Sequence, residues 1–262
     1  MFSQNQLTLA LFFTAAAAAA TTTSDRVQVD WVGASWWPDC RQYAKFVWPL
    51  LKPNEFDQTA VNDSNNNTSQ DDPTDHTNTN TDFNSIVDFA FWPNQAQTLE
   101  ACTNNNTDAE HSYLCKIDHF EACTLQSLDC VGGCQDDTKQ RKLFQFLYCF
   151  EGEHVKALPG KDYPGPSWLK AMKPCATKAG LDYDAIQTCA SNVSSGSALS
   201  VTFDQITKYV ASQPLKYFPW VTLNNVIMGN QCDTCLESWV CGNYTGTNKP
   251  NSCSDTKRPT VC

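Results

Sequence analysis

The chain has 262 residues, 14 of them cysteine, and a formal net charge of −10 at pH 7. So acidic a chain is poorly suited to bind nucleic acid, and a hydrophobic content of 41% excludes a wholly disordered chain. Fourteen cysteines without a metal or cluster motif indicate a disulfide framework that forms in an oxidising compartment.

The first predicted element is a secretion signal at residues 1–20. Leu7–Ala20 is an almost wholly apolar run that suits the core of a signal peptide and is too short to span a bilayer. Residues 1–6 carry no Lys or Arg, so a buried N-terminal helix is the alternative. No later run is apolar enough to span a membrane. We therefore expect a protein of the secretory pathway, with an extracellular or lysosomal destination.

Acceptor triplets for N-glycosylation agree with secretion. Each has the pattern Asn-x-Ser/Thr, which marks a surface position in a secreted protein. The triplets start at Asn62, Asn66, Asn67, Asn105, Asn192 and Asn243.

A strand, a helix and a second strand are predicted after the signal. Val27–Val32 alternates and is rich in β-branched residues, and Ile86–Trp92 has the same β character. Between them, apolar residues follow one helical face. These residues are Tyr43, Phe46, Val47, Leu50 and Leu51. A strand, a helix and a strand in this order form the unit of a parallel α/β sheet.

Residues 54–85 separate this helix from the second strand. They are rich in Asn, Thr and Ser and contain acidic residues but no Lys or Arg. This composition predicts a long disordered loop. Most of the net charge lies here, so the folded body is close to neutral.

Residues 115–213 are predicted to form a helical insertion. Apolar residues at helical spacing mark a short helix around Phe120, and further helices around Leu147, Trp168, Ile186 and Phe203. Asp182 is the predicted N-cap of the helix around Ile186.

The chain returns to strands after the insertion. Tyr217–Leu223 and Val226–Met228 are predicted to form a hairpin around the turn Asn224-Asn225. A last helix is predicted at Thr234–Trp239.

A cysteine in the first turn of the first helix is the principal candidate for chemistry. Unpaired N–H groups at a helix N-terminus favour the thiolate, which is the nucleophilic form. Cys40 has this position, and Pro219 stands at the start of a late strand, where redox folds place a cis-proline. Residues 21–262 are therefore predicted to form a single thioredoxin-like α/β domain with a helical insertion.

Several spaced motifs resemble the gamma-interferon-inducible lysosomal thiol reductase (GILT) family. They are the run Phe218-Pro-Trp-Val-Thr-Leu-Asn224, the segment Cys115-Lys-Ile-Asp-His-Phe-Glu-Ala-Cys123, the helix with Cys149, the Cys175/Cys189 pair, the spacing of Cys241 to Cys253, and Trp48-Pro49. The resemblance covers roughly residues 27–253 outside the Asn-rich loop. It implies a reductase of protein disulfides that uses a Cys-x-x-Cys motif in an acidic endocytic compartment.

This sequence departs from the motif at one position. Trp37-Pro38-Asp39-Cys40 stands where the family has Cys-x-x-Cys, so Trp37 occupies the place of the attacking cysteine. Exchange begins with attack by that first thiolate, and the second thiol releases the product. Reduction by this motif alone is therefore not expected. Cys40 either acts as a monothiol or belongs to a structural disulfide.

The other cysteines are predicted to be mostly structural. Cys232 and Cys235 have the spacing of a redox motif, but separate disulfides to other partners are the preferred interpretation, and Cys130 and Cys134 form a second close pair with no assigned catalysis. The predicted structural cysteines are Cys102, Cys115, Cys123, Cys149, Cys175, Cys189, Cys241 and Cys253.

No metal site and no cofactor are predicted. His111, Cys115, His119 and Cys123 recur at intervals of four, which would stack zinc ligands on one helical face. In an oxidising compartment these cysteines are instead expected to be paired. No Ser/His/Asp set, phosphate-binding loop or paired-carboxylate motif stands out.

Two functions from different classes follow. The first is a GILT-like thiol oxidoreductase that uses Cys40 and Pro219 on protein disulfides. The second is a non-catalytic secreted glycoprotein that binds unfolded proteins, peptides or a partner protein. Trp37 and Trp220 would then form an apolar substrate groove, with packing in the core as the simpler role for both. The sequence does not determine the oligomeric state or the disulfide connectivity.

Overall fold

The computed structural model describes residues 25–35, 37–52, 82–94, 99, 102, 109–153, 166–228 and 232–254. The predicted signal peptide, most of the acidic loop, and Asn62, Asn66, Asn67 and Asn105 lie outside these residues. Within this part of the chain, no helix has both the length and the apolar character needed to cross a membrane.

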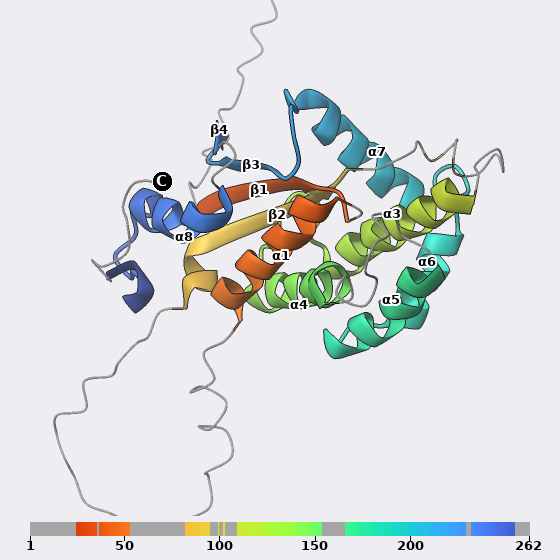
Figure 1. The fold of residues 1–262 in the computed structure, drawn as a ribbon, viewed down its shortest axis with the longest axis horizontal. Coiled ribbons are helices and arrows are strands. Elements are labelled where there is room, and N and C mark those ends of the chain that lie inside the picture. The colour runs from red at the N-terminus through yellow and green to blue at the C-terminus, as the bar shows by residue number, and fades with distance from the viewer. Residues whose placement is uncertain are drawn as a thin grey trace, which may run out of the picture.

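In the described part of the chain, four strands and seven α-helices form a mixed α/β fold (Figure 1). The N-terminal elements are β1 (Val27–Gly33), α1 (Pro38–Leu51), the 3-10 helix η2 (Phe83–Ile86) and β2 (Val87–Pro93). The helical insertion consists of α3 (Ala109–Leu128), α4 (Asp137–Leu147), the π-helical segment η3 (Tyr148–Glu153), α5 (Pro166–Lys178), α6 (Tyr183–Ser191) and α7 (Ala198–Ser212). The C-terminal elements are β3 (Trp220–Leu223), β4 (Val226–Ile227), α8 (Cys232–Asn243) and the 3-10 helix η6 (Asn251–Ser254).

The sheet has the strand order β2-β1-β3-β4. β1 and β2 are parallel with Val27 opposite Val87, whereas β3 is antiparallel to both β1 and β4. The hairpin turn has Asn224 and Asn225 at φ values of 48° and 66°, as a tight turn matching the sheet twist requires. The predicted α/β class, the parallel unit and the hairpin are therefore confirmed.

Helices cover both faces of the sheet. On one face, Trp31 of β1 packs against Tyr43 of α1 and Phe144 of α4, at ring-centroid distances of 4.9 and 6.0 Å. On the other face, Tyr209 of α7 stacks on Trp92 of β2 at 3.8 Å. Burial on both faces explains why β1 and β2 are nearly continuous apolar runs.

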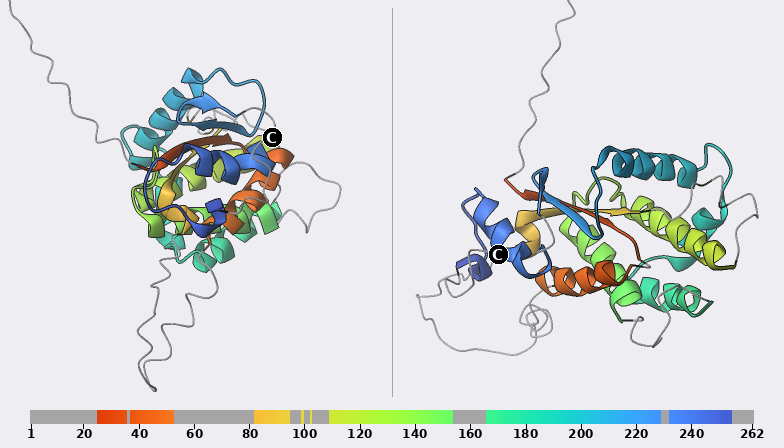
Figure 2. Two further views of the ribbon diagram at one scale, coloured as in Figure 1. Left: turned by 90° about the vertical axis from the view of Figure 1, so that its left-hand side faces the viewer. Right: turned by 45° about the horizontal axis from the view of Figure 1, so that its top comes forward.

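The helices also divide between the two ends of the sheet. α3, α5 and α6 gather beyond one end, and α8 lies at the other, as Figure 1 and the right-hand view of Figure 2 show. β1 ends and α1 begins on the side of α3, α5 and α6 (Figure 1). The turn between β1 and α1 therefore faces the helical insertion.

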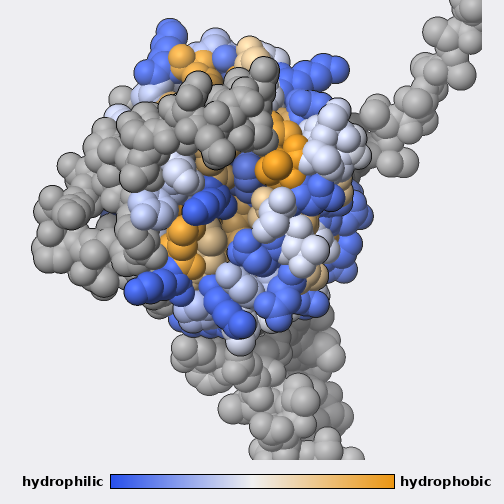
Figure 3. All heavy atoms as spheres, turned by 90° about the vertical axis from the view of Figure 1, so that its right-hand side faces the viewer, coloured by the Kyte–Doolittle hydropathy of each residue, from blue (hydrophilic) through white to orange (hydrophobic). Residues whose placement is uncertain are grey.

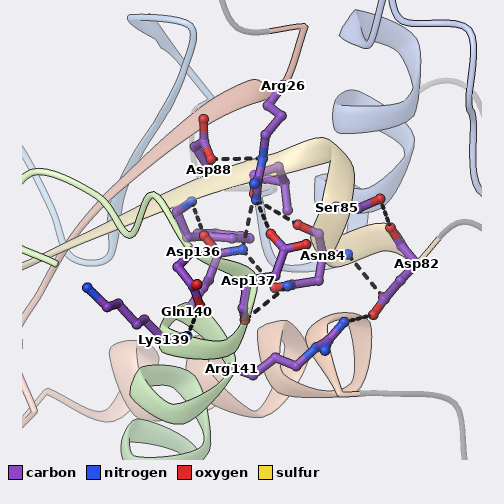
Figure 4. A network of polar contacts seen from close by, with 12 residues as sticks. Arg26, Asp82, Asn84, Ser85, Asp88, Asp136, Asp137, Lys139, Gln140 and Arg141 are labelled. Carbon is purple, nitrogen blue, oxygen red and sulfur yellow. Dashed lines mark hydrogen bonds and ion pairs between the residues drawn. The ribbon is translucent and has the colours of Figure 1, made fainter. Parts of the chain in front are cut away.

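A polar network fastens the other end of β1 to the neighbouring elements (Figure 4). Arg26 forms ion pairs with Asp88 and Asp137, both at 2.8 Å, and donates to the carbonyl oxygens of Asn84 and Val87. Arg141 of α4 pairs with Asp82 just before η2. Asp82 and η2 are thus part of the folded body, so the prediction of a disordered loop up to residue 85 was wrong for residues 82–85.

Several predicted boundaries differ from the structure. The short helix expected around Phe120 is the second half of the 20-residue α3, whose earlier polar residues hid its start. Phe46 was predicted on the buried face of α1 but is 37% exposed, because Cys40, Ala44 and Val47 form that face. β3 begins at Trp220 rather than at residue 217, directly after the cis Phe218–Pro219 bond.

Candidate functional site

The candidate site is the turn that connects β1 with α1. The backbone N–H of Trp37 donates to the carbonyl of Ala34 at 2.8 Å, which closes the turn. Pro38 occupies the first helical position, where its missing N–H leaves no hydrogen bond unmade. The N–H of Ala34 donates to Sγ of Cys40 at 3.3 Å, so the turn folds back onto the thiol.

Cys40 is a free thiol with no exposed surface. Burial raises the pKa of this thiol far above its ordinary value, and the charges of Glu151, Asp39 and Glu121 raise it further. Only the hydrogen bond from Ala34 lowers it. Desolvation therefore outweighs the helix N-terminus, and Cys40 is a protonated thiol rather than a nucleophilic thiolate at neutral pH.

The structure brings Trp37, Cys40 and Pro219 to the same end of β1. The Phe218–Pro219 bond is cis, and Trp220 pairs with Val32 in the sheet, so Pro219 comes next to Gly33 at the start of the turn. Trp37 is 40% exposed, whereas Trp220 is 2% exposed and packs against Tyr217. Of the two predicted groove residues, only Trp37 presents its ring to solvent.

Two buried glutamates lie beneath this turn. Oγ of Ser35 contacts Oε1 of Glu121 and lies 3.2 Å from Oε1 of Glu151. Ser35, Glu121 and Glu151 are each no more than 2% exposed. Glu121 comes from α3 and Glu151 from η3, so the turn is joined to two elements of the insertion.

Burial dominates the electrostatics of the two glutamates. Desolvation raises the pKa of Glu121 to about 8, although its hydrogen bond with Ser35 opposes this. Desolvation also raises the pKa of Glu151, and the charge of Glu121 raises it further. Ser35 and the guanidinium of Arg41 act in the opposite direction on Glu151. Arg41 is itself buried, with its guanidinium carbon 5.6 Å from the ring centroid of Trp168.

Sequence reasoning missed this glutamate pair. The two residues are 30 positions apart, so no local motif joins them. A signal was nevertheless present, because Glu121 follows Ile117 by four positions and Glu151 follows Leu147 by four. Each acidic residue thus continues an apolar helical stripe, where it is predicted to face the core.

The eight cysteines predicted to be structural form four disulfides. The bonds are Cys102–Cys115, Cys123–Cys189, Cys149–Cys175 and Cys241–Cys253. Cys175 and Cys189, which the resemblance groups as a pair, are therefore bonded to different partners. Five described disulfides in all fit an oxidising compartment.

The two close cysteine pairs offer no described dithiol. Cys130 and Cys134 bond to each other and have no exposed surface. Gly132 and Gly133 between them have φ values of 84° and 119°, which side-chain-bearing residues rarely adopt. Cys235 is also disulfide-bonded, and the side chain of Cys232 lies outside the described residues.

The set of His111, Cys115, His119 and Cys123 has no free sulfur ligand for zinc, because Cys115 and Cys123 are both in disulfides. The side chain of His111 lies outside the described residues. His119 is 7% exposed, and burial lowers its pKa. Across the described ranges, no group of three His, Cys, Asp or Glu residues is arranged to hold a metal ion.

A pocket of about 690 Å³ lies between α3, α5 and α6, at the end of the molecule seen in Figure 3. His119, Met172 and Gln187 are among its lining residues. Because it is assembled from three helices, no contiguous sequence pattern predicted it.

Both described glycosylation acceptors are exposed. Asn192 follows the last residue of α6, and Asn243 is the last residue of α8. Their positions leave room for an attached glycan.

In comparisons with known proteins, no family model matches this chain and no curated protein shows significant similarity to it.

Proposed function

We propose that this protein is a non-catalytic secreted glycoprotein with a GILT-like, thioredoxin-like scaffold, which binds unfolded polypeptide through the face around Trp37. The observation that carries the proposal is the combination of a buried thiol and an exposed indole at one helix start. Cys40 has no exposed surface, and Trp37 is 40% exposed three residues earlier.

The chemistry at Cys40 supports binding without turnover. Disulfide reduction requires a thiolate that reaches the substrate sulfur, and then a second thiol that resolves the mixed disulfide. Cys40 is protonated by burial, and it is the only free cysteine among the described residues. An indole instead offers a large apolar surface at a low cost in conformational entropy, as is typical of residues that dominate binding.

The strand arrangement supports the thioredoxin-like part of the proposal. A parallel β1-α1-β2 unit is followed, after the insertion, by the antiparallel strands β3 and β4 and by α8. The cis-proline precedes β3 beside the start of α1. In the described residues, β4 pairs with Thr222 and Leu223 and the N–H of Met228 donates to the carbonyl oxygen of Val221, so this ladder ends before Pro219. An extended peptide would pair at the start of β3.

Fluorescence anisotropy with a fluorescein-labelled, reduced and carboxymethylated insulin B chain tests this function. We expect binding that Trp37→Ala weakens about tenfold, because removing a central aromatic anchor typically costs more than 1 kcal/mol. Phe46→Ala is the matched control, since Phe46 is an aromatic residue of similar exposure on the same helix. Equal affinities of the wild type and Trp37→Ala would contradict the proposal.

A thiol oxidoreductase is the second candidate. It is favoured by the free cysteine at a helix N-terminus beside a cis-proline. Cys40 would then act as a monothiol after local opening of the turn. Insulin reduction that is present in the wild type and absent in Cys40→Ser would establish this candidate and overturn the non-catalytic proposal.

A further inference from the structure

The contacts of Ser35 require a proton on one of the two buried glutamates. A serine hydroxyl has one hydrogen to donate, and an ionised carboxylate only accepts hydrogen bonds. Ser35 nevertheless contacts an oxygen of both Glu121 and Glu151. Both contacts are hydrogen bonds only if Ser35 donates to one carboxylate and the other carboxyl group donates its own proton to Ser35.

The charges around Ser35, Glu121 and Glu151 also indicate that one of the two glutamates is protonated. Arg41 is the cation whose charge acts on Glu151, and it is buried with the pair. One arginine balances one carboxylate, so the second glutamate is charge-compensated only when it is protonated. Cys40 is neutral, and Asp39, whose charge also reaches the thiol, would add repulsion rather than relieve it. Oε2 of Glu151 is buried without a hydrogen-bond partner, which is costly for an ionised group.

The same cluster holds the turn that carries Trp37. Ser35 lies between Ala34, which donates to Cys40 and accepts from Trp37, and the start of α1. Its hydroxyl is the described side-chain link from this turn to α3 and η3. Loss of the shared proton would leave two carboxylates around one hydroxyl, with Arg41 to balance only one of them.

We propose that Glu121, Glu151 and Ser35 form a proton-dependent latch, which holds the Ala34–Cys40 turn closed while the pair keeps one proton and releases the turn when that proton is lost. Glu121 and Glu151 are therefore positioning residues for the Trp37 face. This inference rests on the proposed function only for the role of that face. The latch itself concerns the exposure of Cys40 and needs no bound peptide.

The test measures the labelling rate of Cys40 by iodoacetamide between pH 6 and pH 9.5 in the full-length protein with its disulfides intact. The wild type is compared at each pH with Glu121→Gln, whose amide keeps a hydrogen-bonding partner for Ser35 but has no proton to lose. The Cys40 thiol ionises as the pH rises in both proteins, so the labelling rate of the wild type divided by that of Glu121→Gln reports the opening of the turn. We expect this quotient to be near one at pH 6 and about ten at pH 9.5.

Two further variants make the outcome decisive. Glu151→Gln should remove the alkaline opening of the turn, as Glu121→Gln does. Using both variants keeps the test valid if one of them fails to fold. Asp39→Asn removes an exposed acidic residue beside Cys40 and should retain the alkaline opening of the wild type. A ratio near one throughout the pH range for both glutamine variants would overturn the latch. If labelling follows the expected profile but the insulin B chain does not bind, the latch stands and the proposed function fails.

Discussion

Two regions of the molecule, the α7 face of the sheet and the turn between β1 and α1, bury acidic residues in different ways. On the α7 face, Asp30 is 6% exposed and accepts from the indole N–H of Trp92 at 3.0 Å and from the hydroxyl of Thr222 at 3.5 Å. The phenol of Tyr209 also bonds to Asp30, and its pKa is raised by burial and by the charge of Asp30. Beneath the turn between β1 and α1, Glu121 and Glu151 share the single hydroxyl of Ser35.

The difference teaches what a buried carboxylate requires. Asp30 accepts fixed hydrogen bonds from four side chains, those of Gln28, Trp92, Thr222 and Tyr209. The glutamate pair has one hydroxyl and one neighbouring arginine, so it keeps a proton instead. A buried carboxylate is therefore an acceptor for several donors at Asp30, whereas the glutamate pair shares one hydroxyl and holds a proton.

The largest effect is expected at Asp30. Asp30→Ala leaves the donors of Trp92, Thr222 and Tyr209 without their acceptor, and each unmade buried bond costs about 1–3 kcal/mol. We expect a loss of about 4 kcal/mol in the free energy of unfolding, measured by urea denaturation at pH 7. Asp204→Ala on the exposed side of α7 is the control and should change stability by less than about 0.5 kcal/mol. Similar losses of unfolding free energy in the two variants would show that the hydrogen bonds of Asp30 do not stabilise the fold.

The second effect is a pH dependence from the glutamate pair. The folded protein holds the Glu121 proton up to a pKa of about 8, whereas the unfolded chain loses it near 4.5. Unfolding between these values releases a proton, so rising pH destabilises the fold by up to about 1.4 kcal/mol per pH unit. We expect the wild type to lose about 2 kcal/mol relative to Glu121→Gln between pH 6 and pH 8. Parallel stability curves would show that the pair is ionised throughout.

A smaller effect is expected at Ser35. Ser35→Ala removes the hydroxyl that both glutamates contact and should cost about 1 kcal/mol at pH 6, where the bridge is complete. At pH 9 the cost should shrink, because the wild-type bridge is already released. Thermal unfolding at the two pH values measures this, and a cost that grows with pH would contradict the bridging role.

The smallest effect is expected at Asp39. The charge of Asp39 raises the pKa of Cys40, but its contribution is smaller than that of burial and that of Glu151. Asp39→Asn should therefore speed the alkylation of Cys40 at pH 8 by no more than about threefold. A larger increase would show that a surface charge, rather than burial, keeps this thiol unreactive.

The elements of the fold were largely predictable from local pattern. Val27–Gly33 and Val87–Pro93 are apolar runs rich in β-branched or aromatic residues, and Asp182 caps α6 by accepting from the N–H of Ala185, as predicted. Errors arose where tertiary contacts override the pattern. Phe46 fits an apolar stripe by spacing, yet the sheet contacts the adjacent stripe of α1.

The site was predicted only in part. Cys40 and Pro219 were found because each has a local signature, a helix start and a strand start. The burial of Cys40 and of Trp220 depends on packing from distant segments, which spacing does not encode. Glu121 and Glu151 meet only because α3 and η3 both reach the turn after β1, a juxtaposition that the order of residues does not reveal.

The described disulfides cross-link the helical insertion internally and do not join it to the strands of the sheet. Cys123–Cys189 joins α3 to α6, and Cys149–Cys175 joins η3 to α5, so both bonds stay within the insertion. None of the five described bonds crosses from the insertion to a strand of the sheet. In the described residues, the contact between the insertion and the sheet is held by packing, by hydrogen bonds and by the ion pairs of Arg26 with Asp137 and of Arg141 with Asp82. We therefore expect an applied pulling force to separate this contact before it unfolds the disulfide-bonded insertion.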